Sequence, residues 1–179
     1  VQTSAGDIAC SRAVIAAGVH SKVLAAAAGD RVFLESERGY HVVFENPDMT
    51  IRPPVMPGDA KMAITSTQTG FRVSGQVELA SVQAAPDWRR AEILRRFAID
   101  NFPPLRQRQE HLQTIATDGE APAGMRRWMG HRPSTPDGLP VLSPGIACPD
   151  IFHAFGHGHV GLACGPISGK IIAELITHG

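Results

Sequence analysis

The stretch FHAFGHGHVG, residues 152–161, decides which fold this chain of 179 residues can adopt. The apolar run 151–155 predicts a short β-strand, and Gly156, Gly158 and Gly161 follow it as a GxGxxG pattern. Glycine permits positive φ and close approach of a ligand, and a helix N-terminus offers N–H groups to an anion. The stretch therefore predicts a strand–turn–helix unit whose turn either reverses the chain or faces a ligand. The helix is expected over residues 162–176, with these side chains facing inward: Ile167, Ile171, Ile172 and Leu175.

A second apolar run, AVIAA at residues 13–17, is typical of a strand buried on both faces in a parallel sheet. Gly18 ends this run, and a helical turn is predicted from Ser21 to Ala28. A buried strand needs neighbours, and the residues before it supply none. The chain also ends 18 residues after Gly161, without the second strand and acidic residue of a complete dinucleotide fingerprint. We therefore expect the chain to begin inside a domain whose other strands lie outside it.

The middle of the chain has the period of two that is typical of antiparallel strands. Strands are predicted at 40–44, 61–67, 71–79 and 115–119. Pro86 and Asp87 begin a helix that extends to Asn101, before Pro103 and Pro104. Its buried stripe is expected to contain Ile93, Leu94, Phe97 and Ala98, and its solvated face Arg89, Arg90, Glu92, Arg95 and Arg96. This region indicates a sheet with a helix packed against it.

Composition excludes several classes of function. Lys plus Arg equals Asp plus Glu at 17 each, so the overall charge does not favour nucleic acid or an anionic membrane. We expect no transmembrane segment, because no apolar run approaches the roughly 18 residues that cross a bilayer. The start at Val1 has no signal-peptide pattern. Cys10, Cys148 and Cys164 are widely spaced and odd in number, which favours free thiols in a reducing compartment.

Two further segments carry candidate binding residues. Arg132 lies between Gly130 and Pro133 in a segment that predicts a rigid polar loop, from which a guanidinium can bind a carboxylate in bidentate fashion. Surface arginines are common, so a plain surface role stays open. Tyr40 and His41 begin the strand 40–44 and are candidates for lining a pocket, although a tyrosine at a sheet edge can also point into water.

A histidine cluster raises a different possibility. His153, His157 and His159 lie close together in sequence and could bind a metal ion in a metal-dependent hydrolase. No HExxH pattern or carboxylate partner accompanies them. Strand alternation puts His153 on the same face as Phe155, whereas His157 and His159 lie in the turn. We expect no metal site and favour hydrogen bonds from these rings, or ring contacts with a ligand.

Five stretches in order resemble the D-amino-acid dehydrogenase branch of the D-amino-acid oxidase-like (DAO) flavoenzymes, and together they cover nearly the whole chain. They are AVIAAGVHSK (13–22), ERGYHVVF (37–44), GFRVSGQVELA (70–80), WMGHRPSTPDGLPVLSP (128–144) and FHAFGHGHVGLACGP (152–166). One departure is Val19-His20, where many relatives carry an aromatic residue, often Trp. The resemblance implies an FAD-dependent oxidoreductase that oxidises D-amino acids or related amines by hydride transfer to flavin N5. The flavin performs this chemistry, so no acid or base catalyst is required of the chain.

The resemblance also implies a fold and a division of the chain. The expected fold class is α+β, with a mixed, largely antiparallel sheet and flanking helices plus a strand and C-terminal helix of the FAD-binding domain. Residues 1–30 would belong to the FAD-binding domain, 31–125 to the substrate-binding domain, and 126–179 to a carboxylate-binding segment, a glycine-rich flavin-contacting turn and the last helix.

Residue roles follow from the same resemblance. Arg132, Tyr40 and His41 would contact the substrate. FAD would contact a set made mostly of turn residues: Gly18, Gly130, Gly156, His157, Gly158, His159, Val160, Gly161 and Leu162. The partners would be a small amino acid or amine and the N-terminal FAD-binding portion of the same protein. The location would be cytoplasmic, and a peripheral association of the parent enzyme with the inner membrane stays open.

The chain alone is expected to be an inactive fragment that binds FAD weakly or not at all. Two alternatives to the oxidoreductase stay open at this point. One is the metal-dependent hydrolase that uses His153, His157 and His159. The other is a non-catalytic module that binds a small molecule. Metal analysis separates the hydrolase from the oxidoreductase, because only the former requires a metal.

Overall fold

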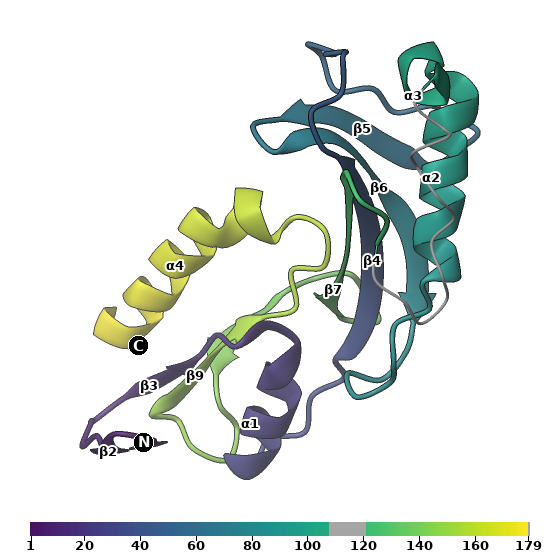
Figure 1. Ribbon diagram of the computed structural model, residues 1–179. Coiled ribbons are helices and arrows are strands. Elements are labelled where there is room, and N and C mark those ends of the chain that lie inside the picture. The colour runs from purple at the N-terminus through teal and green to yellow at the C-terminus, as the bar shows by residue number, and fades with distance from the viewer. Residues whose placement is uncertain (108–120, 179) are drawn as a thin grey trace. The chain divides into compact units, whose positions relative to one another are not determined.

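The computed structural model describes residues 1–107 and 121–178, and Figure 1 draws the chain as ribbons. It divides into two compact units. Unit 1 contains residues 1–37, 80–82 and 131–179, and unit 2 contains residues 38–79 and 83–130. The chain passes from one unit to the other within strands β4 (Glu35–Phe44) and β7 (Met125–Ser134), and also on either side of residues 80–82. The strand predicted at 115–119 lies outside the described residues.

Unit 2 is a sheet covered on one face by a helix. The sheet has the order β5-β6-β4-β7, with β5 at Met62–Thr67 and β6 at Gly70–Leu79. Strands β5 and β6 pair in antiparallel fashion from Met62 with Gly75 to Thr67 with Gly70. Helix α2, Arg89–Asn101, lies along the sheet (Figure 1), and α3, Pro103–Gln107, follows it. The antiparallel hairpin expected here is confirmed.

The core of unit 2 lies between the sheet and helix α2. Alternate residues of β4, namely Tyr40, Val42 and Phe44, are buried there with Phe71 and Val73 of β6. Helix α2 contributes Leu94, Ala98 and Ile99 to the same cluster. The strand period of two puts the residues between them, such as His41 and Arg72, on the other face of the sheet.

Helix α2 corrects part of the expected solvated face. Glu92 and Arg95 are buried, whereas Ile93, placed in the buried stripe by sequence, is 47% exposed. The two charged side chains are tolerated because they pair with each other, Arg95 Nε lying 2.7 Å from Glu92 Oε2. Arg96 also binds Glu92 at 2.9 Å. The helix is therefore rotated relative to the face that hydrophobicity alone predicts.

Unit 1 contains a small mixed sheet between helices. Strand β9 (Ile151–Phe155) is central, parallel to β3 (Ala13–Ile15) and antiparallel to β8 (Val141–Pro144). Helices α1 (Ser21–Ala27) and α4 (Gly161–His178) lie on opposite sides of β3 and β9 in Figure 1. The remaining elements are the short strands β1 (Gln2–Thr3) and β2 (Gly6–Asp7) and the 3₁₀ turn η1 (Gly18–His20). The predicted strand 151–155 and the helix that follows it are confirmed.

Several burial predictions for unit 1 are wrong. Strand β3 covers only residues 13–15, and Val14 is 43% exposed because β3 is an edge strand of its described sheet. In α4, Ile172 is buried, but Ile167 and Ile171 are exposed. The buried apolar cluster of this unit contains Ala25, Leu34 and Phe155. A few apolar side chains thus form its core, and others of the same type face outward.

The fold class is confirmed in its coarse form, as mixed α and β structure with antiparallel sheets. The expected boundaries 1–30, 31–125 and 126–179 stay a prediction, although unit 1 joins the first and last of these segments almost completely. Among the described residues, no helix has the length and apolar character needed to cross a membrane.

Candidate functional site

Two glycine turns lie at the same edge of the unit 1 sheet. Strands β3 and β9 run parallel, with Ala13 opposite Ile151 and Ile15 opposite His153. Their carboxyl ends therefore meet at one edge, the edge at which open α/β sheets bind ligands. Gly18 follows β3 with φ +57°, and Gly156 and Gly158 follow β9 with φ +91° and +52°. The two sequence stretches expected to border a ligand are thus brought together.

The turn after β9 is held against the end of strand β7. The Gly158 N–H donates to the Pro133 carbonyl at 2.9 Å. Ser134 and His157 are also paired, as an isolated antiparallel β-bridge. A Cβ on Gly156 would lie 2.9 Å from Thr135 Cγ2, so a larger residue would push these segments apart. The turn and the segment carrying Arg132 therefore form one surface within unit 1.

Arg132 lies in strand β7, which corrects the expected rigid loop. Pro133 suggested a loop, but β7 is an edge strand, where a missing N–H is tolerated. The Arg132 side chain is about one quarter exposed, and its Nη1 is 3.7 Å from Glu37 Oε1. That nitrogen is buried and has no hydrogen-bond partner within residues 1–107 and 121–178. A buried N–H of this kind is costly unless a further acceptor reaches it.

Glu37 is a residue of this surface that the sequence did not single out. Its carboxylate accepts a hydrogen bond from Ser134 Oγ at 3.1 Å and lies 3.2 Å from His159 Nε2 as well as near Arg132. It therefore connects the end of β7 to the glycine turn. The only sequence signal was an acidic residue opening the stretch ERGYHVVF.

The three clustered histidines have three different partners. His153 Nε2 binds Asp30 Oδ2 at 2.6 Å, His157 Nε2 binds Ser168 Oγ at 2.8 Å, and His159 faces Glu37. Two hydrogen bonds hold the pKa of Asp30 below its ordinary value. The larger effect comes from His153 and the smaller from the Ala147 N–H. Among the residues described, there is no group of three or more potential metal ligands. Nothing observed therefore favours the hydrolase alternative.

The predicted flavin-contacting residues at the start of α4 are accessible. Val160 is about half exposed and Leu162 is 98% exposed. The first N–H groups of an α-helix have no acceptor within the helix. The contacts predicted for Val160, Gly161 and Leu162 stay predictions, but this end of the helix is open to a ligand.

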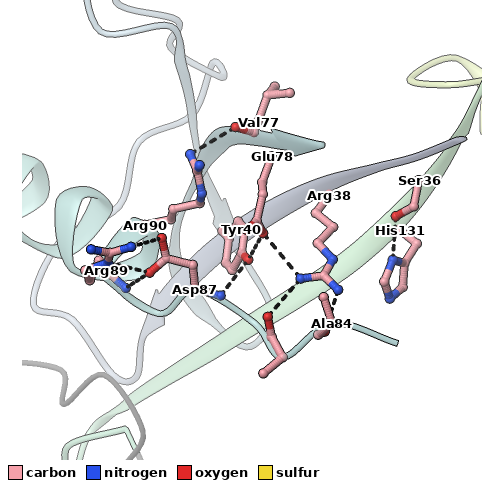
Figure 2. Close-up of polar contacts among 11 residues, drawn as sticks. Ser36, Arg38, Tyr40, Val77, Glu78, Ala84, Asp87, Arg89, Arg90 and His131 are labelled. Carbon is pink, nitrogen blue, oxygen red and sulfur yellow. Dashed lines mark hydrogen bonds and ion pairs between the residues drawn. The ribbon is translucent and has the colours of Figure 1, made fainter. Parts of the chain in front are cut away.

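Tyr40 lies in the core of unit 2 with both hydrogen-bonding functions used. Its hydroxyl donates to Glu78 and accepts from the Asp87 N–H at 3.0 Å (Figure 2). The pKa of the Tyr40 hydroxyl is raised, mainly by burial and to a smaller extent by Glu78. The hydroxyl therefore stays protonated and can donate a hydrogen bond at neutral pH. The buried Arg38 binds Glu78 and the carbonyl groups of Ala84 and Ala85. These contacts favour a structural role for Tyr40, whose predicted substrate contact stays untested.

His41 and Gly130 lie together on the other face of the unit 2 sheet. The His41 ring stacks on Trp128, with centroids 4.9 Å apart and an angle of 17° between the planes. A Cβ on Gly130 would come within 1.8 Å of the Trp128 ring, so this glycine provides the space for the indole. The predicted cofactor contact of Gly130 stays a prediction. In this structure, the missing side chain of Gly130 leaves the space that the Trp128 ring occupies.

Comparison with known proteins now identifies the family. The sequence profile of the FAD dependent oxidoreductase family, DAO, matches residues 1–175. The chain belongs to the DAO family of FAD-dependent oxidoreductases. It is 46% identical over 178 residues to a D-amino-acid oxidase of Bradyrhizobium diazoefficiens, covering 99% of this chain and 39% of that protein. It is 32% identical over 186 residues to a D-amino acid dehydrogenase of Vibrio cholerae, again covering 39% of the relative and 100% of this chain.

Solved DAO-type structures share the fold. Glycine oxidase from Geobacillus kaustophilus superposes with a TM-score of 0.76 at 22% identity, over 98% of this chain and 44% of that one. L-proline dehydrogenase from P. horikoshii gives 0.75 at 21% identity, over 98% and 45% of the two chains. The chain thus spans about two fifths of the length of these relatives, and it carries the DAO fold throughout.

Proposed function

We propose that this chain supplies the substrate-binding part and the flavin-facing turn of an FAD-dependent oxidoreductase that acts on D-amino acids or related amines. The observation that supports this most strongly is the surface in unit 1 where Arg132 and the glycine turn meet, linked by Glu37 and by the Gly158–Pro133 hydrogen bond. It combines a cation suited to a carboxylate with backbone suited to a cofactor.

The residues at this surface fit FAD. A Cβ built on Gly18 meets no atom within 4 Å, and one on Gly158 meets only Ser134 Oγ at 3.8 Å, so the backbone at both turns is open. Within unit 1, the cofactor would be held by Gly18 and the turn residues from Gly156 to Leu162. The contact predicted for Gly130, in unit 2, stays untested. When bound, FAD supplies the acceptor for the hydride that leaves the substrate α-carbon. The chain orients the substrate and keeps water away from it.

Arg132 is proposed to bind the substrate carboxylate. Its Nη1 forms no hydrogen bond among the described residues, and a planar guanidinium matches a carboxylate in bidentate geometry. Glu37 would be a positioning residue that holds this guanidinium and the His159 ring in a fixed arrangement. The substrate contacts predicted for Tyr40 and His41, both in unit 2, stay untested.

The chain is proposed to act together with an FAD-binding portion of the same protein. The proposal rests on the family, since the chain spans only 39% of the D-amino-acid oxidase and the D-amino acid dehydrogenase that it resembles. The three cysteines are free, which supports a reducing, cytoplasmic location.

The test uses Arg132→Gln in the FAD-loaded full-length protein. Losing a bidentate charged contact costs about 2–4 kcal/mol, so KM for a D-amino acid should rise by about two orders of magnitude. Flavin content, read from visible absorbance, should not change. The matched control is Arg52→Gln, which removes an exposed arginine and should leave KM unchanged. An unchanged KM in Arg132→Gln would remove Arg132 from this role.

A further inference from the structure

Unit 2 contains a second candidate site, which we call the His41 cavity. It has a volume of about 410 Å³ and is lined chiefly by His41, Val43, Thr69, Arg72, Arg126 and Trp128. This volume lies within the roughly 300–1,000 Å³ of small-molecule pockets. The cavity opens on the sheet face opposite to helix α2, because the residues adjacent to His41 and Arg72 in sequence belong to the core.

Two buried nitrogen atoms at the cavity lack a hydrogen-bond partner. They are His41 Nδ1 and Arg72 Nε, as judged within residues 1–107 and 121–178. Native proteins seldom leave buried polar atoms unsatisfied, so each indicates a missing acceptor or donor. Arg72 Nε can only donate, which requires that its missing partner be an acceptor.

The charge of the cavity favours an anion. Its lining includes arginines from β6 and β7 and no acidic residue. Arg126 is partly neutralised, since its Nε lies 2.7 Å from Glu45 and its guanidinium also reaches the Thr69 carbonyl. Arg72 has no ion-pair partner in the described part of the chain. An anion in the cavity would therefore meet an uncompensated positive charge.

One wall of the cavity is apolar and aromatic. The Trp128 indole is about half exposed, stacks on His41 and rests over Gly130. The pKa of His41 is lowered to about 4 by burial and then by the charges of Arg72 and Arg126. The ring is therefore neutral at pH 7 and adds no charge of its own.

We propose that the His41 cavity binds a small organic carboxylate, with Arg72 donating to the carboxylate and Trp128 contacting an apolar body. This goes beyond the proposed function, because it concerns unit 2 and needs neither flavin nor turnover. A bare inorganic anion would leave the indole wall unused, and a neutral molecule would leave the Arg72 charge unpaired.

The test is isothermal titration calorimetry of this chain with cyclohexanecarboxylate, its neutral amide and inorganic phosphate. The carboxylate should bind at least about tenfold more tightly than either other probe, since a charge-assisted hydrogen bond contributes about that factor. Arg72→Gln should weaken carboxylate binding by a similar factor, and the control Arg52→Gln should not. Equal binding of the amide, or equal binding of phosphate, overturns the proposal.

Two further measurements test the proposal without relying on Arg72→Gln. Gly130→Ala should displace the Trp128 ring and weaken carboxylate binding. In the unmodified chain, saturating carboxylate should raise the pKa of the His41 ring, followed by NMR, because an anion offsets the charges of Arg72 and Arg126 that face it. An unchanged His41 pKa, or full binding in Gly130→Ala, contradicts the proposed location.

Discussion

The two units are stabilised in different ways. Among the described residues, unit 2 has an apolar cluster of 13 buried residues between a sheet and a helix, whereas the cluster of unit 1 has three. Unit 1 depends more on polar contacts, such as Asp30 with His153 and His157 with Ser168. The same polar contacts fix the glycine turn and the end of β7. Unit 2 is therefore stabilised mainly by packing, whereas unit 1 uses polar contacts to hold the residues of the proposed site and has a smaller core.

Phe71→Ala is expected to have the largest effect on stability. Phe71 is fully buried in unit 2 and touches Phe44 and Phe102, so its removal should cost about 3–5 kcal/mol. Both tryptophans, Trp88 and Trp128, lie in unit 2, so tryptophan fluorescence in a urea titration reports this unit. Leu162→Ala, at a 98% exposed site in unit 1, is the control and should change little. A loss below 1 kcal/mol in Phe71→Ala would contradict the large-core description.

Asp30→Asn tests the polar contacts of unit 1. Asp30 accepts from the N–H groups of Ile146 and Ala147 and binds His153, and a damaged buried network should cost about 1–3 kcal/mol. Because the pKa of Asp30 is lowered, its stabilisation is present above about pH 4, the usual carboxyl value, and is lost as pH falls through the lowered value. Amide hydrogen exchange of β9 measures the loss of stability in Asp30→Asn. Faster exchange confined to unit 2 would contradict the stabilising role of Asp30 in unit 1.

Gly18→Ala should cost about 1–2 kcal/mol, because φ is +57° and an alanine there is strained although space is available. Gly165→Ala in α4 provides a matched control, since φ there is ordinary and no atom lies within 4 Å of the added Cβ. Thermal unfolding followed by circular dichroism compares the two. Equal stability of the two variants would contradict the left-handed conformation of Gly18.

The smallest effect is expected from His41. Its folded pKa of about 4 is below the ordinary value of 6.5, so unit 2 should lose stability as pH falls from about 6.5 to 4. His41→Gln should flatten this fall, and His20→Gln, at an exposed site in unit 1, should not. The effect is limited because the ring is only partly buried. Identical pH profiles for His41→Gln and the unmodified chain would show that His41 is not the titrating group.

Local sequence patterns predicted several strands and the glycine turn, because strand alternation and positive-φ glycines are properties of neighbouring residues. The strand 151–155 and the hairpin of β5 and β6 were found for this reason. Strand β7 was expected to be a loop, because Pro133 hides its strand character. The buried face of α2 was predicted less well, because the pairing of Glu92 with Arg95 allows two charged residues to lie in the interior. Glu37 was missed because its partners Arg132 and His159 lie about a hundred residues further along the chain.

The central claim is that Arg132 and the glycine turn after β9 form one site for a substrate carboxylate and a flavin. The most direct measurement is the visible absorption spectrum of the FAD-loaded full-length protein during anaerobic titration with a slowly reacting D-amino acid. We predict a saturable change in the flavin bands that needs about a hundredfold more ligand in Arg132→Gln, with flavin content unchanged. Equal ligand dependence in the two proteins would contradict the claim.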